Sequence, residues 1–213
     1  MTEDRADMGF MARGLDLARG QLGRTAPNPS VGCVVVRAGR IIAEGATGAG
    51  GRPHAEEIAL EAAGQAANGA IAYVTLEPCN VRSSGAASCA DLLIAASITR
   101  VVIACEDPHR LGAGGLAQLR AAGIDVAIGL MRKEAETLNA GFFKLVATGR
   151  PWLAIDGDRL SYDAEFELAG KETYEQALDR FGNAGLTRVF VQPRTPLAAQ
   201  LKARGLIDGD NTK

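Results

Sequence analysis

The sequence predicts a three-layer α/β/α sandwich built on a mixed sheet, followed by a small C-terminal α/β segment. Short apolar stretches rich in Val and Ile alternate along the chain with stretches rich in Ala, Leu and Glu, which is the pattern of buried strands between helices. The first two strands flank a short turn at residues 38–40 and form an antiparallel hairpin. Helices separate the later strands, which therefore pair in parallel through right-handed crossovers.

The first predicted domain spans residues 1–149. Met8, Met11 and Leu15 recur at helical spacing and predict an amphipathic first helix. Pro78 suits the first turn of a helix, because the N–H that proline lacks has no partner there. The predicted elements are a helix over about 6–22, strands over 31–36 and 41–44, a helix over 54–67, a strand over 71–76, a helix from Pro78 that continues over 89–96, a strand over 100–105, a helix over 116–122, a strand over 124–128 and a helix over 132–146.

Gly149, Arg150 and Pro151 mark the predicted boundary to a second segment, residues 150–213. A segment of about 60 residues lies at the lower edge of independent folding, so we expect it to pack on the first domain or on a partner chain. Its predicted elements are a strand over 152–155, a helix over about 172–181, a strand over 186–191 and a helix over 197–204.

The composition indicates a globular protein that acts on a small molecule. Hydrophobic residues make up 47% of the 213 residues, and 23 Lys and Arg are balanced by 25 Asp and Glu. No basic run stands out, which argues against a nucleic-acid partner. The chain shows neither an apolar signal region at its N-terminus nor a stretch long enough to span a membrane, so we expect a cytoplasmic protein without a membrane partner. In that compartment its four cysteines favour metal ligation or core packing over disulfides.

Three residues, His54, Cys79 and Cys89, predict a zinc site. One imidazole and two thiolates supply the three protein ligands of a catalytic zinc, whose fourth position stays open for a water of lowered pKa. Glu56 follows His54 by two residues and can transfer protons to and from that water without binding the metal. The order H-x-E, P-C, C is the zinc-deaminase signature, with the glutamate as general acid and base.

Position within predicted elements adds to this interpretation. His54 and Cys79 both lie at predicted helix starts, and the positive end of a helix dipole favours thiolate over thiol at Cys79. The other two cysteines, Cys33 and Cys105, lie inside apolar strand stretches and are expected in the core.

These residues resemble the deaminase domain of the bifunctional deaminase/reductase family of riboflavin biosynthesis, a branch of the cytidine-deaminase-like superfamily. The resemblance extends over about residues 8–150. The matching segments include residues 11–12, 25–32, 51–56, 75–79, 106–108 and 138–143.

The resemblance implies a substrate, 2,5-diamino-6-ribosylamino-pyrimidinone 5-phosphate, which loses a ring amine as ammonia when its cyclic amidine C–N bond is hydrolysed. It also implies substrate-binding roles for Asn28, Glu77 and Asp107. Residues 80–88, between the two cysteine ligands, are one residue longer than the family's segment and lack its two prolines. We expect Arg82 to replace the family's cation there and Arg110 to bind the phosphate as a planar fork.

The C-terminal segment resembles the beginning and the end of the family's reductase domain, at 152–155 and 177–208, without most of its middle. Pro193 and Arg194 stand where the family has a Gly-Gly pair that lets the backbone approach a cofactor phosphate. We therefore expect a degenerate remnant that binds no NADPH and serves packing or homodimerisation.

Three functions follow from these patterns. The leading one is a single-function riboflavin-pathway deaminase whose reductase partner is a separate protein. The second keeps the zinc chemistry but acts on another amino-pyrimidine or pteridine-like ring. The third is a non-catalytic zinc scaffold for a partner reductase, in which Glu56 would have no purpose.

Overall fold

The computed structural model describes residues 3–82, 85–109 and 112–211. The chain folds into two compact units. The first comprises Met1–Gly20, Ser30–Gly48 and Arg52–Leu138, and the second comprises Gln21–Pro29, Ala49–Gly51 and Asn139–Lys213.

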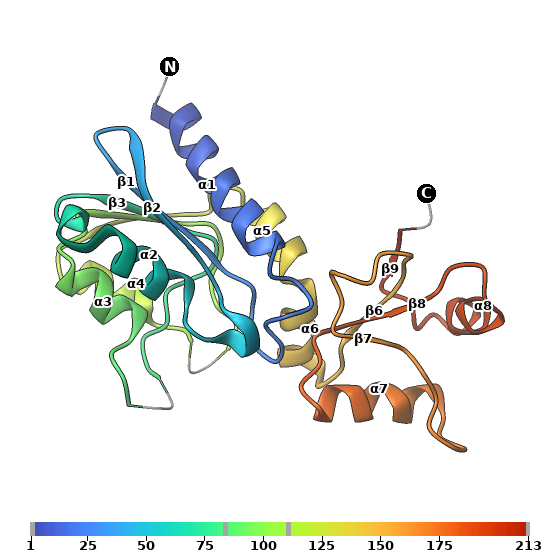
Figure 1. Ribbon diagram of the computed structural model, residues 1–213. Helices are drawn as coiled ribbons and strands as arrows, with labels where there is room; N and C mark the ends of the chain where they lie inside the picture. The colour runs from blue at the N-terminus through green and yellow to red at the C-terminus, as the bar shows by residue number, and fades with distance from the viewer. Residues whose placement is uncertain (1–2, 83–84, 110–111, 212–213) are drawn as a thin grey trace. The chain divides into compact units, whose positions relative to one another are not determined.

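The first unit is built on a five-stranded mixed sheet of order β2-β1-β3-β4-β5 (Figure 1). Strand β1 pairs antiparallel with β2 and β3, whereas β3, β4 and β5 run parallel. Ala38 and Gly39 connect the hairpin with φ of 48° and 72°, the backbone of a type I′ turn, so the predicted hairpin is confirmed. The strands are β1 (Gly32–Arg37), β2 (Arg40–Ala46), β3 (Ile71–Val74), β4 (Arg100–Ile103) and β5 (Asp125–Ile128).

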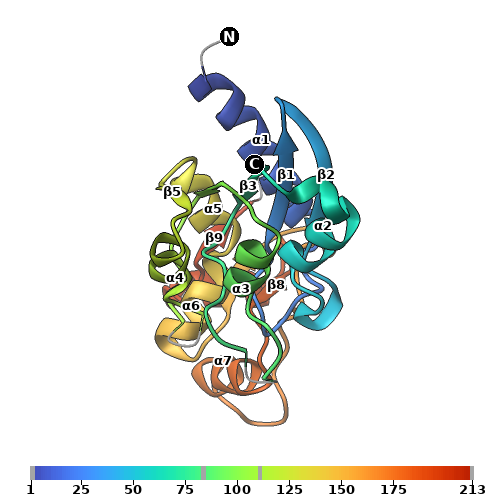
Figure 2. The same cartoon turned by 90° about the vertical axis from the view of Figure 1, so that its left-hand side faces the viewer.

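Helices cover both faces of this sheet. Helix α1 packs on β1, β2 and β3 together with α5, and α2, α3 and α4 form a row over the opposite face (Figures 1 and 2). Because both faces are covered, the inner strands are buried on both sides, as Val34, Val35, Val101 and Val102 show. The predicted three-layer sandwich is confirmed. Its helices are α1 (Glu3–Arg19), α2 (Ala55–Ala63), α3 (Cys89–Ala95), α4 (Gly115–Ala121) and α5 (Arg132–Leu138), with a 3-10 turn at Gly64–Ala67.

The prediction of a helix starting at Pro78 is wrong. The backbone around Pro78 bonds to other segments instead of to itself: Glu77 N donates to Cys105 O (2.9 Å) and Asn80 N to Gly112 O (3.3 Å). The helix begins only at Cys89, because Ser88 caps it. The Ser88 hydroxyl accepts from Asp91 N, and the Asp91 carboxylate accepts from Ser88 N, at 3.0 Å each. This reciprocal pair is a capping box, a signal present in the sequence.

The helix predicted over 132–146 is divided in two at Asn139, which lies at the start of α6 (Ala140–Thr148) with φ of −95° and ψ of 17°. Asparagine favours such cap positions because its side chain competes with the helical backbone for hydrogen bonds. Helix α6 packs on β6, so the compact units divide after Leu138, earlier than the predicted boundary at 149–150. Across the part of the chain that the structure describes, no helix has the length and hydropathy needed to cross a membrane.

The second unit contains a four-stranded parallel sheet of order β7-β8-β6-β9. Strands β6 and β8 and the two helices after them confirm the prediction, whereas the two-residue strands β7 and β9 are too short to show a pattern. The elements are β6 (Trp152–Ile155), β7 (Ala164–Glu165), α7 (Tyr174–Asn183), β8 (Arg188–Val191), α8 (Pro196–Ala203), β9 (Gly209–Asp210) and the 3-10 turn η1 (Ala49–Gly51).

The core of the second unit follows the alternation of its two central strands. One face of β6 and β8 packs against α7, α8 and Phe166, and Ala154 and Phe190 on the other face pack against Tyr162. The larger cluster contains Leu153, Ile155, Phe166, Ala177, Leu178, Phe181, Val189, Val191, Ala198 and Leu201.

Candidate metal centre

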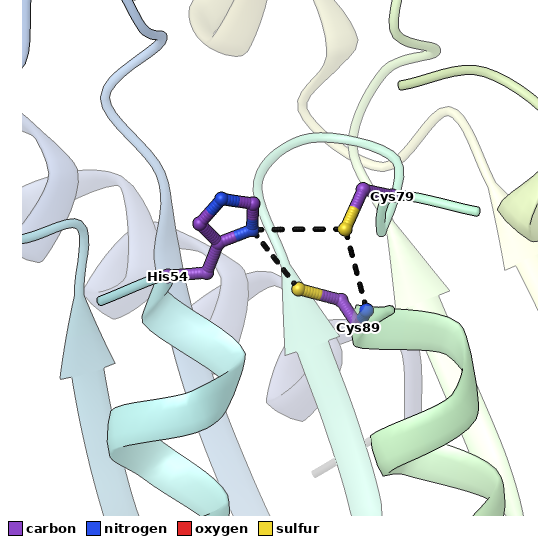
Figure 3. A group of neighbouring side chains, drawn as sticks. All are labelled: His54, Cys79 and Cys89. Atoms are coloured by element: carbon purple, nitrogen blue, oxygen red, sulfur yellow. Dashed lines mark hydrogen bonds between the residues drawn. The ribbon is translucent and has the colours of Figure 1, made fainter. Parts of the chain in front are cut away.

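Three side chains able to bind a metal come together in the first unit. Figure 3 shows the ring of His54, just before α2, facing Cys79 in the loop after β3 and Cys89 at the start of α3. Their ligand atoms all lie within 4.8 Å of one another. His54 Nδ1 is 3.1 Å from Cys89 Sγ and 3.7 Å from Cys79 Sγ. Tetrahedral zinc with ordinary bond lengths separates a nitrogen and a sulfur ligand by about 3.6 Å, so the three residues fit one zinc ion.

Two glycines allow the backbone to bring these ligands close. A Cβ on Gly45 of β2 would lie 2.1 Å from Ala55 O, so α2 can begin directly against the sheet only because this residue is glycine. A Cβ on Gly115, at the start of α4, would lie 1.9 Å from Pro78 O in the same way. These close approaches set the positions of His54 and Cys79, the immediate neighbours of Ala55 and Pro78.

The start of α3 serves both cysteines. Cys89 N donates to Cys79 Sγ (3.3 Å), and Ala90 N donates to Cys79 O (3.2 Å). The helix N-terminus that favours a thiolate at Cys79 is therefore that of α3, not one at Pro78. A hydrogen bond from the Cys89 thiol lowers the pKa of Cys79 far below its ordinary value. The same bond, with burial, raises the pKa of Cys89.

Glu56 lies in the first turn of α2 and is only 3% exposed. Burial raises its pKa, and interactions with His54 and Cys89 partly offset that effect. The site therefore combines three metal ligands with a buried carboxyl group whose protonated form is stabilised.

A second carboxylate at this site, Glu57, was not singled out from the sequence. Its Oε2 accepts from His54 N (2.7 Å), and its Oε1 accepts from Arg82 Nη1 (2.7 Å). Arg82 Nη2 also donates to Cys89 Sγ (3.3 Å). The available signal was a glutamate three residues after the residue that precedes the helix, the spacing of a capping box. On the outer side of the ring, the guanidinium of Arg52 contacts His54 Nε2.

Two of the predicted substrate-binding residues lie in the loops that follow β3 and β4. The buried Glu77 carboxylate accepts from Gly114 N (2.9 Å), Leu116 N (3.0 Å) and Asp107 N (3.3 Å), and so ties Asp107 to the start of α4. The Asp107 carboxylate accepts from His109 N (2.8 Å), and burial raises its pKa. Arg110, predicted to bind phosphate, lies outside the described residues.

Asn28, Cys33 and Cys105 are not among the candidate metal ligands. Asn28 belongs to the second unit, where its side-chain Nδ2 donates to Gly50 O (3.1 Å) and its backbone carbonyl accepts from Thr25 Oγ1 (3.0 Å). Cys33 and Cys105 are buried beside apolar strand residues, which confirms their predicted place in the core.

Comparison with known proteins agrees with this geometry. A family model described as the cytidine and deoxycytidylate deaminase zinc-binding region matches residues 5–105, a stretch that contains all three candidate ligands. The crystal structure of a diaminohydroxyphosphoribosylaminopyrimidine deaminase/5-amino-6-(5-phosphoribosylamino)uracil reductase from Thermotoga maritima is similar with a TM-score of 0.85 and 25% identity, over 100% of this chain and 88% of that one. Fold and site define a zinc-dependent deaminase of the cytidine-deaminase type, with zinc as its cofactor.

Curated relatives specify the branch. RibD of Escherichia coli is 50% identical over 147 residues, which are 68% of this chain and 40% of that protein. The diaminohydroxyphosphoribosylamino-pyrimidine deaminase of Buchnera aphidicola is 42% identical over 146 residues, which are 68% of this chain and 99% of that protein. The chain therefore belongs to the riboflavin-biosynthesis deaminase family, which confirms the resemblance seen in its sequence. It spans about two fifths of the length of Escherichia coli RibD.

Proposed function

We propose that this chain acts in riboflavin biosynthesis on 2,5-diamino-6-ribosylamino-pyrimidinone 5-phosphate. It hydrolyses the cyclic amidine C–N bond that holds the ring amine, which is released as ammonia. The observation that carries the proposal is the buried carboxyl group of Glu56 beside His54, Cys79 and Cys89. The name and the full coverage of the Buchnera aphidicola relative support this choice of substrate.

In this mechanism His54, Cys79 and Cys89 would hold a zinc ion, which would supply Lewis acidity to the attacking water. Glu56 takes one proton from the attacking water and delivers it to a ring nitrogen, and it then transfers the second proton of that water to the departing amine, which leaves as ammonia. A group that both accepts and returns protons works best with a pKa near the operating pH. Burial moves Glu56 in that direction, because it raises the pKa of the carboxyl group.

The substrate is a small molecule, and the resemblance assigns its recognition to Asn28 and Asp107. We assign the phosphate to Arg110, whose guanidinium can bind it as a planar fork. Glu77 contributes by holding the loop that carries Asp107, since three backbone N–H groups occupy its carboxylate. The proposal includes a cytoplasmic enzyme, a homodimer and a separate reductase that consumes the product.

We further propose that residues 150–213 are a degenerate reductase remnant that binds no NADPH. The similarity to the Thermotoga maritima deaminase/reductase covers 100% of this chain and thus includes this segment. Arg194 adopts a φ of 61°, a backbone conformation that glycine takes without strain, at the place where the family has a glycine pair. NADPH should therefore cause no change in protein fluorescence on titration, whereas saturable binding would contradict the assignment.

Ammonia release from the diaminopyrimidine nucleotide tests the main proposal. Zinc-loaded protein should release one ammonia per substrate, and Glu56→Gln should slow release by about 10²–10⁴-fold with zinc content unchanged. Glu61→Gln, an exposed glutamate on the same helix, is the matched control and should behave as wild type.

Two other outcomes would replace this function. Release from a different amino-pyrimidine or pteridine-like ring, and none from the nucleotide, would support the second substrate class, which the unusual 80–88 segment favours. Unchanged pathway flux with Glu56→Gln would support a zinc scaffold.

A further inference from the structure

Arg82 lies in the 80–88 segment, where this chain departs from its family, and its side chain is only 5% exposed. An arginine that binds a substrate phosphate should expose its guanidinium to solvent when no substrate is bound. Instead, Nη1 donates to Glu57 Oε1 at 2.7 Å and Nη2 donates to Cys89 Sγ at 3.3 Å. Both ends of the planar fork are thus occupied by protein groups.

Glu57 extends this contact to a second metal ligand. One carboxylate oxygen accepts from Arg82, and the other accepts from the backbone N of His54 at 2.7 Å. Arg82 and Glu57 therefore connect Cys89 to His54 by a path that does not pass through the metal position. Groups that hydrogen-bond to metal ligands in this way orient the ligands and tune the metal.

The charges at the site indicate what the contact between Arg82 and Cys89 does. Two thiolates cancel the charge of a zinc ion, and the buried carboxyl group of Glu56 lies beside them. A guanidinium bonded to a thiolate stabilises its ionised form and withdraws electron density from the sulfur, which leaves the metal a stronger Lewis acid. Arg52 also reaches the site, at His54 Nε2, but its side chain is exposed and the charge is screened by water.

We propose that Arg82 is a positioning residue of the zinc centre, which together with Glu57 holds Cys89 and His54 in place for the metal. The inference rests on the proposed zinc function and gives Arg82 a role other than substrate binding.

Metal affinity, measured without substrate, tests the role directly. Competition with a chromophoric chelator for Zn²⁺ should show that Arg82→Gln weakens binding by about 10–100-fold, the usual effect of losing a group that supports a metal ligand. In the Co²⁺-substituted protein, the thiolate-to-cobalt charge-transfer band should shift in the same variant. Arg82→Lys should recover part of the affinity, because it keeps the charge but not the fork. Arg120→Gln, an exposed arginine on α4, should match wild type in both measurements.

Glu57→Gln is the second variant, needed if Arg82→Gln does not fold. It keeps the shape of the side chain and removes the charge that bridges Arg82 and His54, and it should also weaken Zn²⁺ binding. Wild-type affinity and an unshifted cobalt band in Arg82→Gln, or wild-type affinity in Glu57→Gln, would overturn the proposal. A raised KM with unchanged metal affinity would return Arg82 to substrate binding. Because these readouts need no turnover, they are independent of whether wild-type protein releases ammonia from the nucleotide.

Discussion

The two units of this chain use the same alternation of strands and helices, but among the described residues only the first unit gathers side chains that could hold a metal. In the second unit, the polar groups at the strand ends bond to one another: Asp156 Oδ2 accepts from Tyr162 Oη and from Asn211 Nδ2, at 2.7 Å each. Within residues 3–82, 85–109 and 112–211, the trio in the first unit is the one group suited to a metal. Polar side chains at the ends of strands therefore form a binding site only where they come together and are not already hydrogen-bonded to one another.

Both units also use a buried or half-buried acid to tie down a loop. Glu77 accepts from three backbone N–H groups in the first unit, and in the second unit Asp163 Oδ2 accepts from Thr187 N, Thr187 Oγ1 and Arg188 N at 2.7–2.9 Å. The device is the same, but only the first loop belongs to the candidate site. Matched substitutions in the two units can separate the contribution to folding from the contribution to function.

The largest difference is expected from the metal ligands. Cys89→Ser should remove stoichiometric zinc and with it the catalysed reaction, a loss of at least about 10⁶-fold, the low end of enzymatic acceleration. Elemental analysis and ammonia release measure the two effects. Cys105→Ala, a buried cysteine outside the site, should keep both zinc and activity. Full zinc occupancy in Cys89→Ser would show that Cys89 is not a metal ligand and would remove the difference from Cys105.

Truncation of one core leucine in each unit should cost about 2–5 kcal/mol locally. Leu93 on α3 and Leu178 on α7 are both buried, so Leu93→Ala and Leu178→Ala are a matched pair. Hydrogen exchange of the amides in α3 and α7 reports each cost separately. Zinc affinity should fall only with Leu93→Ala, because α3 begins with a metal ligand, and an equal fall with Leu178→Ala would contradict the separation of the units.

Loss of the acid in each loop should cost about 1.5–3 kcal/mol, the value of hydrogen bonds to a charged group. Glu77→Gln should loosen Asp107 and the start of α4, to which Glu77 is bonded, and should raise KM, since Asp107 is a proposed substrate-binding residue. Asp163→Asn should destabilise the start of β8 and leave the kinetics unchanged. Steady-state kinetics with hydrogen exchange distinguishes the two, and a kinetic effect of Asp163→Asn would show that the second unit takes part in turnover.

The smallest effects are expected at two helix caps. Ser88 accepts from Asp91 N and Thr173 accepts from Gln176 N, so replacing either with Ala should cost about 1 kcal/mol. Ser88→Ala should in addition weaken zinc binding, because it loosens the turn that presents Cys89. Thr173→Ala should leave zinc binding unchanged, and chelator competition on the two variants measures this difference.

Much of the fold could be predicted from the sequence because strands and helices obey local rules. The hairpin needed only two apolar stretches and a turn of Ala38 and Gly39, and the parallel strands needed only their flanking helices. Errors arose where two local signals competed. Pro78 suited a helix start, but the capping box of Ser88 and Asp91 set the actual one. Asn139 gives a local signal for the helix break, because asparagine favours cap positions, whereas the two-residue strands β7 and β9 are too short to show a pattern.

The sequence by itself determined the family and predicted His54, Cys79, Cys89 and Glu56 as the residues of a zinc site, because that chemistry requires these residue types in this order. Only the tertiary structure decided what their neighbours do. Arg82 and Glu57 are 25 residues apart and could each have faced solvent. They meet because α2 and the segment before α3 are packed side by side, and a contact of that range depends on the folded arrangement of the whole unit.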